Sequence, residues 1–360
     1  MRTRFHYRTL TDSSGLRLIW FFLFASCLSP IEFPTDNIGD RIVISGQVSP
    51  IPDQNIVQVG ITATTDRLPI PLSDAVVHLF NDSGEGFMYT EIPSNPGNYI
   101  LSDFVGIPGT TYRLVVVTPE GKTYESQPER MPGSAGQLTT HYDFVTEEYS
   151  DLEGIISQQP FIKIRINTIL PSREEPVYVK WNVEETFLLS PTDFPDPFGY
   201  VPPSCFVVQN ADPQRITLFN GEEVQAASVD NLLVASRIID WTFLEKHYFT
   251  IYQSSMTQEA HEYWRKVDIL ANQVGSIFDT PPAEITGNIH NVNNPSEKVY
   301  GYFQAANQVY DRIYLLESHL PFPLTVRDCT YDGRNFQDYP SRCLDCLSVR
   351  NSSHQRPPWF

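Results

Sequence analysis

Five cysteines are the residues of this 360-residue chain whose positions suggest defined chemistry. Cys27 follows Phe24-Ala25-Ser26, and this segment resembles the lipobox at which bacterial lipoproteins are cleaved and acylated. More than one acyl chain on the processed cysteine would anchor the protein stably, because each buried methylene contributes about 0.8 kcal/mol. The sequence therefore predicts lipid attachment at Cys27, with Phe24 in the place of the usual Leu.

The other four cysteines are Cys205, Cys329, Cys343 and Cys346. An even number in an exported chain predicts two disulfides, and three pairings are open. One of these pairings joins Cys205 to the C-terminal segment and fixes the tail 357–360. The C-x-x-C formed by Cys343 and Cys346 would also suit a redox pair or half of a zinc site, but no second C-x-x-C or spaced histidine pair accompanies it.

A third candidate is a polar segment rich in side-chain amides. Its members could hydrogen-bond a sugar or a peptide backbone, and they are Asn288, His290, Asn291, Asn293 and Asn294. Clusters of Asn and Pro also form turns, so the alternative is a loop that only shapes the fold.

Motifs for catalysis are absent from the sequence. There is no G-x-S-x-G elbow, no pair of histidines four residues apart and no phosphate-binding glycine loop. The adjacent carboxylates Glu184-Glu185 and Glu222-Glu223 are interpreted as solvated surface. We therefore expect no enzyme activity, no metal and no cofactor, with a hydrolase site that assembles only in three dimensions as the remaining alternative.

The first 26 residues have the layout of a signal peptide. Four arginines precede the apolar run 18–24, which is too short to span a bilayer as a stable helix. Residues 27–40 contain two prolines and no periodicity, which predicts a tether. No later segment holds eighteen consecutive apolar residues, so the anchor is expected to be the lipid.

The chain is strongly acidic, with a formal net charge of -18. Residues 1–26 contain four arginines and one aspartate, so their removal leaves 21 basic and 42 acidic residues and a net charge of -21. Such a charge repels phosphate backbones and anionic headgroups, which argues against nucleic-acid partners and electrostatic adsorption to lipid. Two explanations are consistent with this net charge, a solvated surface and the attraction of cationic ligands.

The periodicity predicts a mainly β protein with two domains. Residues 41–131 contain seven short apolar runs separated by turn residues, which is typical of a sandwich like the immunoglobulin-like and carboxypeptidase-regulatory-like modules. The runs are Ile42–Val48, Ile56–Ala63, Ala75–Phe80, Phe87–Ile92, Tyr99–Leu101, Tyr112–Thr118 and Thr123–Ser126. Residues 132–150 are interpreted as a linker.

Residues 151–360 are predicted to form a second β-rich domain with one amphipathic helix near 256–274. Alternation marks strands at 161–166 and 177–183, and further strands are expected at 232–239, 248–252, 299–304 and 312–315. The helix has an apolar stripe, a capping box of Ser255 and Gln258, and Gly275 as its stop. We expect the stripe to be part of the core.

The block 248–303 resembles a family of lipoproteins. Its segments Tyr248–Gln253, Glu262-Tyr263-Trp264, Gly275–Asp279, Ile285–Ile289 and Gly301-Tyr302-Phe303 are similar to the family called domain of unknown function 4249. The resemblance implies an exported lipoprotein of a Bacteroidota-type outer membrane, often encoded beside a TonB-dependent receptor. The segment after Cys27 lacks the acidic cluster common at surface-exported members, so it leaves open whether the body faces outward or the periplasm.

Three functions are consistent with these features. The first, which we adopt, is a non-catalytic outer-membrane lipoprotein that docks on a TonB-dependent transporter and helps to capture its ligand, whose identity is open. The second is a free-standing surface adhesin or structural module, and the third is the hydrolase mentioned above. Recovery of a barrel protein with the lipoprotein would separate the first from the second.

Overall fold

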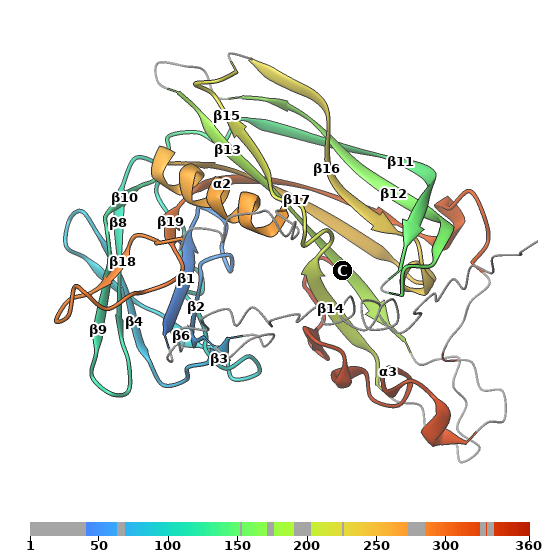
Figure 1. Cartoon of the computed structure of the whole chain (residues 1–360), viewed down its shortest axis with the longest axis horizontal. Coiled ribbons are helices and arrows are strands. Elements are labelled where there is room, and N and C mark those ends of the chain that lie inside the picture. Colours follow the sequence, from blue (N-terminus) through green and yellow to red (C-terminus); the bar gives the residue numbers. More distant parts are fainter. Residues whose placement is uncertain are drawn as a thin grey trace, which may run out of the picture. The chain divides into compact units, whose positions relative to one another are not determined.

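The computed structural model describes residues 41–62, 69–151, 153–170, 176–190, 203–224, 227–272, 285–324, 329 and 335–360. The expected signal peptide (1–26) and tether (27–40) lie outside the described residues. Asp40–Phe360 forms one compact unit. Its described part is mainly β and contains four sheets, which confirms the predicted class (Figure 1).

The first sandwich consists of sheets A and B, which share one apolar core. Alternation places Tyr112, Leu114 and Val116 of β8 in that core, opposite Ile44 of β1. Sheet A contains β1 (Ile42–Val48), β2 (Ile56–Ile61), β3 (Ile70–Pro71), β6 (Thr90–Glu91), β7 (Asn98–Ile100) and β19 (Phe303–Ala305). Sheet B contains β4 (Val76–Asn81), β5 (Gly86–Met88), β8 (Thr111–Val117), β9 (Thr123–Ser126), β10 (Glu129–Arg130) and β18 (Ile289–Asn291).

Two strands of this sandwich come from far along the chain. β19 pairs in parallel with β1, and β18 pairs with β9. The segment 285–306, called here the return segment, therefore belongs to the first sandwich, and the expected boundary of a separate domain at 151–360 is wrong. The strand expected at 299–304 is shorter and begins at Phe303, because Gly301 lies so close to β1 that a Cβ there would be 2.0 Å from the Ile44 carbonyl oxygen.

The second sandwich consists of sheets C and D. Residues such as Ile164 of β12 and Ile251 of β17 share its core. Sheet C contains β11 (Gln137–Ser150), β12 (Ile156–Ile169) and β16 (Ser228–Ile238). Sheet D contains β13 (Tyr178–Leu189), β14 (Cys205–Asn210), β15 (Thr217–Asn220), β17 (His247–Met256), β20 (Asn307–Leu315) and β21 (Ser352–Ser353).

The expected linker at 132–150 is wrong for most of its length. Residues 137–150 form β11, whose fourteen residues all pair with β12. Polar residues such as Thr139, Asp143 and Glu147 suggested a linker, but they lie on a strand whose apolar partners, among them Tyr142 and Phe144, pack against the core of the second sandwich.

The helix α2 (Gln258–Asn272) forms where a helix was expected and packs beside β13 and β15. The expected capping box is wrong, because β17 continues through Ser255 and Thr257 accepts the first capping bond instead, 3.2 Å from the Ala260 amide nitrogen. Ala260 is buried while Leu270 is exposed, so only the first half of the apolar stripe is core. Gly275 lies outside the described residues.

The remaining helical segments are single turns near the ends of strands and in the C-terminal segment. They are η2 (Trp241–Phe243), η3 (Glu317–His319), η4 (Phe336–Asp338), α3 (Ser341–Leu344) and η5 (Cys346–Ser348).

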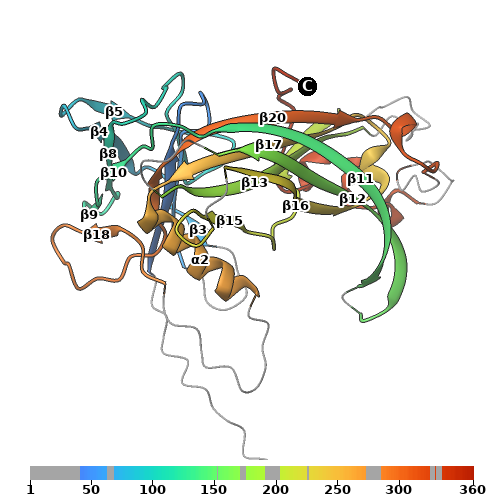
Figure 2. The same ribbon diagram turned by 90° about the horizontal axis from the view of Figure 1, so that it is seen from above.

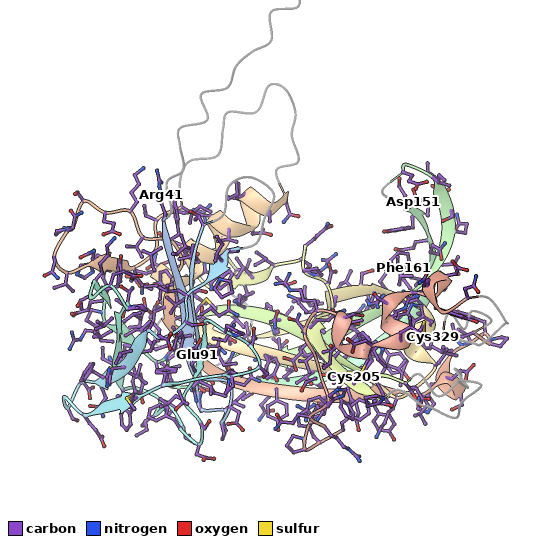
Figure 3. The ribbon with its side chains drawn as sticks, turned by 90° about the horizontal axis from the view of Figure 1, so that it is seen from below. Arg41, Glu91, Asp151, Phe161, Cys205 and Cys329 are labelled. Carbon is purple, nitrogen blue, oxygen red and sulfur yellow. A yellow bond between two sulfur atoms is a disulfide. The ribbon has the colours of Figure 1, made fainter. Side chains whose placement is uncertain are left out.

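The end of the β11–β12 hairpin extends beyond the rest of sheet C. β16 pairs with β12 only as far as Phe161, so residues 145–160 form a two-stranded ribbon (Figures 2 and 3). Asp151 fixes the turn, because its side chain accepts bonds from the amides of Glu153 and Ile155 at 2.9 and 2.8 Å. The Asp151 side chain therefore closes the turn at the end of the ribbon.

A buried carboxylate joins the two sandwiches. Glu129 of β10 accepts hydrogen bonds from Thr257 at the start of α2 (2.8 Å), from Asn288 (3.2 Å) and from the Tyr302 hydroxyl. All three donors are neutral, and desolvation by burial raises the pKa of Glu129. First sandwich, second sandwich and return segment thus meet at one side chain, called here the Glu129 junction.

We expect Glu129→Ala to destabilise the protein by about 3 kcal/mol or more, because it leaves three buried donors without their acceptor. Urea unfolding of the disulfide-intact protein measures this. The control is Glu125→Ala, which removes a partly exposed ion pair with Arg113 and should cost less than about 1 kcal/mol. Equal effects of the two substitutions would contradict a special role of the junction.

Candidate functional site

The amide-rich segment is occupied mainly with its own fold. The Asn288 side chain bonds Glu129 and both backbone groups of Phe303, at 2.8 Å to the carbonyl oxygen and 2.9 Å from the amide. Asn291 donates to Glu297 and accepts from the amides of the next loop residues. His290, Asn293 and Asn294 are exposed. The structure brings no ligand-facing constellation together here, in accord with the turn alternative.

The four described cysteines form two disulfides. Cys205 pairs with Cys346, which ties β14 to the C-terminal segment as one of the expected pairings proposed, and Cys329 pairs with Cys343. The two cysteines of the C-x-x-C thus have different partners. His354 lies 3.5 Å from the Cys205 sulfur, but both sulfurs of that bridge are consumed and offer no thiolate to a metal. Cys27 lies outside the described residues.

The outward face of sheet D carries an unusual set of polar and aromatic side chains. We call it the open face, and its members project from alternate positions of neighbouring strands, opposite the core side. They are Lys180, Asn182 and Glu184 of β13, Tyr248, Thr250 and Tyr252 of β17, Tyr310, Arg312 and Tyr314 of β20, and Asn210 of β14. Its members on β17 are buried, whereas Tyr310, Tyr314, Asn182 and Asn210 are exposed. Lys246 precedes β17, and the C-terminal Trp359 and Phe360 pack against Tyr248.

Three cations of this face rest on aromatic rings. The Lys180 Nζ lies 3.3 Å from the centre of the Trp264 ring, and the Lys246 Nζ lies 4.4 Å from that of Tyr314. The Arg312 guanidinium carbon lies 3.7 Å from the centre of the Trp359 ring. Such contacts hold a cation without neutralising it. None of the three has a carboxylate within ion-pair distance among the residues that the structure describes.

Two titratable groups of the open face have strongly shifted pKa values. Desolvation by burial lowers the pKa of Lys180 to about 7, and it raises the pKa of Glu184 to about 7 even though Arg312 opposes that shift. Within the described ranges neither side chain has a hydrogen-bonding partner. Partly buried charges without partners are unfavourable for folding, so their presence indicates a site that a ligand completes.

A second polar cluster, on the core side of the same sheet, is enclosed. Glu185 accepts from Arg237 at 2.9 Å and lies 3.0 Å from the His247 Nε2, and Gln209 also donates to it. The side chains of Glu185 and His247 are 1% and 0% exposed, and Phe243 stacks on the imidazole. Because no substrate can reach these groups, the cluster is a structural network despite its acid–base composition.

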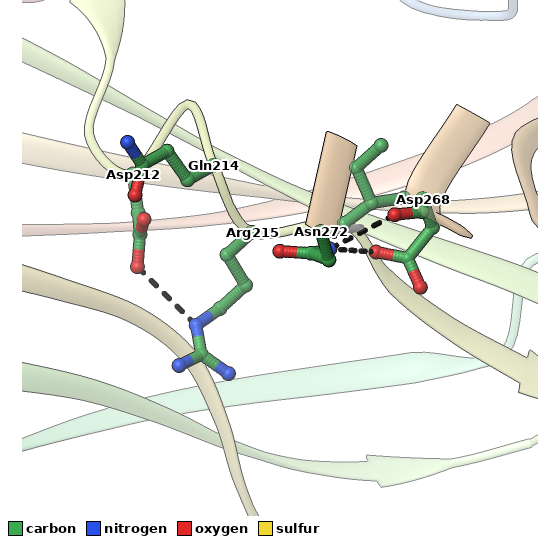
Figure 4. Close-up of a pocket in the computed structure, with 6 residues that line it drawn as sticks. Asp212, Gln214, Arg215, Asp268 and Asn272 are labelled. Atoms are coloured by element: carbon green, nitrogen blue, oxygen red, sulfur yellow. Dashed lines mark hydrogen bonds and ion pairs between the residues drawn. The ribbon is translucent and has the colours of Figure 1, made fainter. Parts of the chain in front are cut away.

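A cleft of about 320 Å³ lies at the end of α2 (Figure 4). Its polar groups satisfy one another: Asp212 pairs with Arg215 at 3.2 Å, and Asn272 donates to the Asp268 carboxylate at 2.7 Å. The other lining residues are Gln214 and Ile216. With its charges already paired, this cleft is a weaker candidate than the open face.

Sequence reasoning missed the open face. The run Tyr310-x-Arg312-x-Tyr314 was visible as an alternation of aromatic and cationic residues on one side of a strand, and Glu184 was interpreted as surface. No local pattern in the sequence shows that Trp264 and Trp359, which come from distant segments, pack against Lys180 and Arg312.

The family comparison agrees with the resemblance drawn from the residues. The model of a domain of unknown function, DUF4249, matches residues 29–312, and the chain belongs to this family. No curated protein matches the chain. In the described part of the chain no helix has the length and apolar character to cross a bilayer.

We expect Glu184→Gln to change the pH dependence of stability. A carboxyl whose pKa rises from 4.5 to about 7 on folding makes the wild type lose stability as pH rises through that window, and glutamine removes the effect. The stability of the variant relative to wild type should therefore increase by about 3 kcal/mol between pH 4 and pH 8. Urea unfolding at both pH values measures it, with the exposed Glu148→Gln as control, and a constant difference would contradict the shift.

Proposed function

We propose that this protein is a non-catalytic, lipid-anchored outer-membrane binding protein that serves a TonB-dependent transporter, with the open face as its ligand-capture surface. The observation that carries the proposal is the group of unpaired charges on that face. Aromatic rings hold Lys180 and Arg312, and among the described residues no ion pair or hydrogen bond holds the side chain of Glu184.

A binding role is favoured over catalysis by the arrangement of the titratable groups. Among the described residues, no hydroxyl or thiol hydrogen-bonds Lys180 or Glu184, so neither has a nucleophile to activate. The acid–base cluster of Glu185 and His247 is closed to solvent. A hydrolase site would need an accessible version of such a cluster.

Membrane attachment through Cys27 rests on the sequence of residues 1–27. The basic segment, the short apolar run and the Phe24-Ala25-Ser26-Cys27 motif support processing and acylation. A Bacteroidota-type outer membrane is what the resemblance to the family implies. Family membership also supports a transporter as the neighbour, because members are often encoded beside such receptors.

The two-stranded ribbon at the end of the β11–β12 hairpin is the element best suited to dock on the transporter. Its tip exposes Ile156 to 69%, together with Tyr149 and Ile155, beyond the last strand that could cover them. A two-stranded ribbon gains little stability in isolation, and apolar residues at its end are typical of protein contacts. Acidic neighbours such as Glu148 and Glu153 suit a partner surface with an apolar site and a basic rim.

Pull-down of the mature lipoprotein from detergent-solubilised outer membranes tests the proposal. We expect a β-barrel transporter to co-purify with the wild type, and the double substitution Ile155→Ser, Ile156→Ser to reduce its recovery at least tenfold. Ile169→Ser is the matched control, because this residue is 57% exposed on the other end of the same strand. Recovery of no barrel protein with the wild type would overturn the transporter role.

Mass spectrometry of the same native preparation tests the anchor. We expect an N-terminal Cys27 that carries acyl chains, and Cys27→Ser should move the protein from the membrane to the soluble fraction. A retained leader or an unmodified cysteine would contradict lipid anchoring.

A further inference from the structure

The open face gathers three cations that have no carboxylate within ion-pair distance among the residues that the structure describes, namely Lys180, Lys246 and Arg312. Six basic side chains elsewhere in the described part do have such a partner, and these are Arg113, Lys122, Lys163, Arg165, Arg215 and Arg237. The chain has 43 acidic residues against 25 basic ones, so acidic groups that could pair with a cation are abundant. Free cations gathered on one face indicate a ligand that carries negative charge.

Arg312 is held by both aromatic rings and a hydrogen bond. Its guanidinium lies over the rings of Tyr310 and Trp359, at 5.2 and 3.7 Å, and its Nε donates to the Thr250 hydroxyl at 2.8 Å. The side chain therefore cannot swing freely, and its terminal nitrogens are presented as a fixed fork. Such a fork matches the two oxygens of a carboxylate.

Exposed tyrosines stand on both sides of Arg312. Tyr310 is 50% and Tyr314 47% exposed, and each lies two residues from Arg312 on the same side of β20. The backbone separation is about 7 Å on each side. Flat aromatic rings at this spacing around a cation suit a ligand made of linked rings, and the exposed amides of Asn182 and Asn210 offer hydrogen bonds to hydroxyl groups.

A peptide ligand fits this geometry less well than a saccharide. Peptides commonly add a strand to a free sheet edge, but β11 lies along the edge of β20, where the Thr140 amide donates to Asp311 at 2.8 Å. The recognition groups instead project from the face of the sheet. The strong net negative charge also disfavours long polyanions, so a short ligand with few charges is expected.

We propose that the open face binds a short acidic oligosaccharide, with a uronate carboxylate on Arg312 and pyranose rings stacked on Tyr310 and Tyr314. This inference rests on the proposed capture role of that face. Glu184 is the carboxyl group of the open face, and because burial raises its pKa to about 7, its repulsion of the ligand carboxylate is weakened at neutral pH. Lys180 and Lys246 extend the cationic surface toward its two ends.

Calorimetric titration of the full mature protein tests the proposal. The probes are tetrasaccharides of galacturonate, of alginate and of hyaluronan, together with the methyl ester of the first. We expect at least one free acid to bind with a Kd at least tenfold lower than a neutral counterpart. Arg312→Ala should weaken that binding at least tenfold and Arg312→Lys several-fold, because lysine keeps the charge and loses the fork.

Further variants separate recognition from folding. Tyr314→Ala should weaken binding of both the acid and its ester, because stacking does not depend on charge. Arg165→Ala removes an arginine of sheet C that pairs with Asp143 at 3.1 Å, and it should leave binding unchanged. Circular dichroism and thermal unfolding confirm that each variant folds, and quenching of Trp359 fluorescence on binding gives a second readout at the site.

Three results would overturn the inference. These are equal binding of the acid and ester forms, tighter binding of hexaglutamate than of any uronate, or no binding of the three acids. If binding fails while the transporter still co-purifies, the ligand class is wrong and the docking role stands. If uronate binding holds while no transporter is recovered, the ligand class stands and the docking role is wrong.

Discussion

The Glu129 carboxylate imposes the constraint on which the arrangement of both sandwiches depends. A buried carboxylate needs hydrogen-bond donors, and its donors come from the start of α2 and from both ends of the return segment. Tyr302, one of the donors, also packs on Tyr263 of α2. The carboxylate is therefore satisfied only when the first sandwich, α2 and β19 are all in place, which makes the two halves one compact unit and positions α2 with Trp264 beside Lys180.

Adjacent residues of β13 have opposite environments on the two faces of one strand. Glu185 points into the second sandwich, where Arg237, His247 and Gln209 satisfy it completely. Glu184 points to the open face and has no such partners within the described ranges. Arg237 and Arg312 differ in the same way, because Arg237 pairs with Glu185 while Arg312 has no ion-pair partner in the described part of the chain. The charge of Glu185 is compensated inside the fold, whereas a desolvated charge without a partner lowers stability, a cost that the proposed ligand would offset.

Much of the fold could be predicted from local pattern because a half-buried strand records its burial in the alternation of its residues. Ile42–Val48 and Thr123–Ser126 form strands with the expected bounds, and α2 lies within the expected range. The errors occurred where tertiary pairing overrides composition. Polar residues of β11 suggested a linker, because a strand can be stabilised by a long partner such as β12 whatever its own hydrophobicity. The C-x-x-C could not reveal that each cysteine bonds a different remote partner.

The sequence by itself determined the β class, the membership in the DUF4249 family and the presence of four cysteines after residue 200 for two bridges, because each of these depends on residue type and short-range spacing. Only the tertiary structure decided the parallel pairing of β19 with β1, the partners of the four cysteines and the composition of the open face. These features join residues far apart in the chain, as in the bond between Gln304 and Gln47, which lie 257 positions apart. Such contacts are set by the simultaneous satisfaction of buried polar groups across the whole fold, and no local window of sequence contains that information.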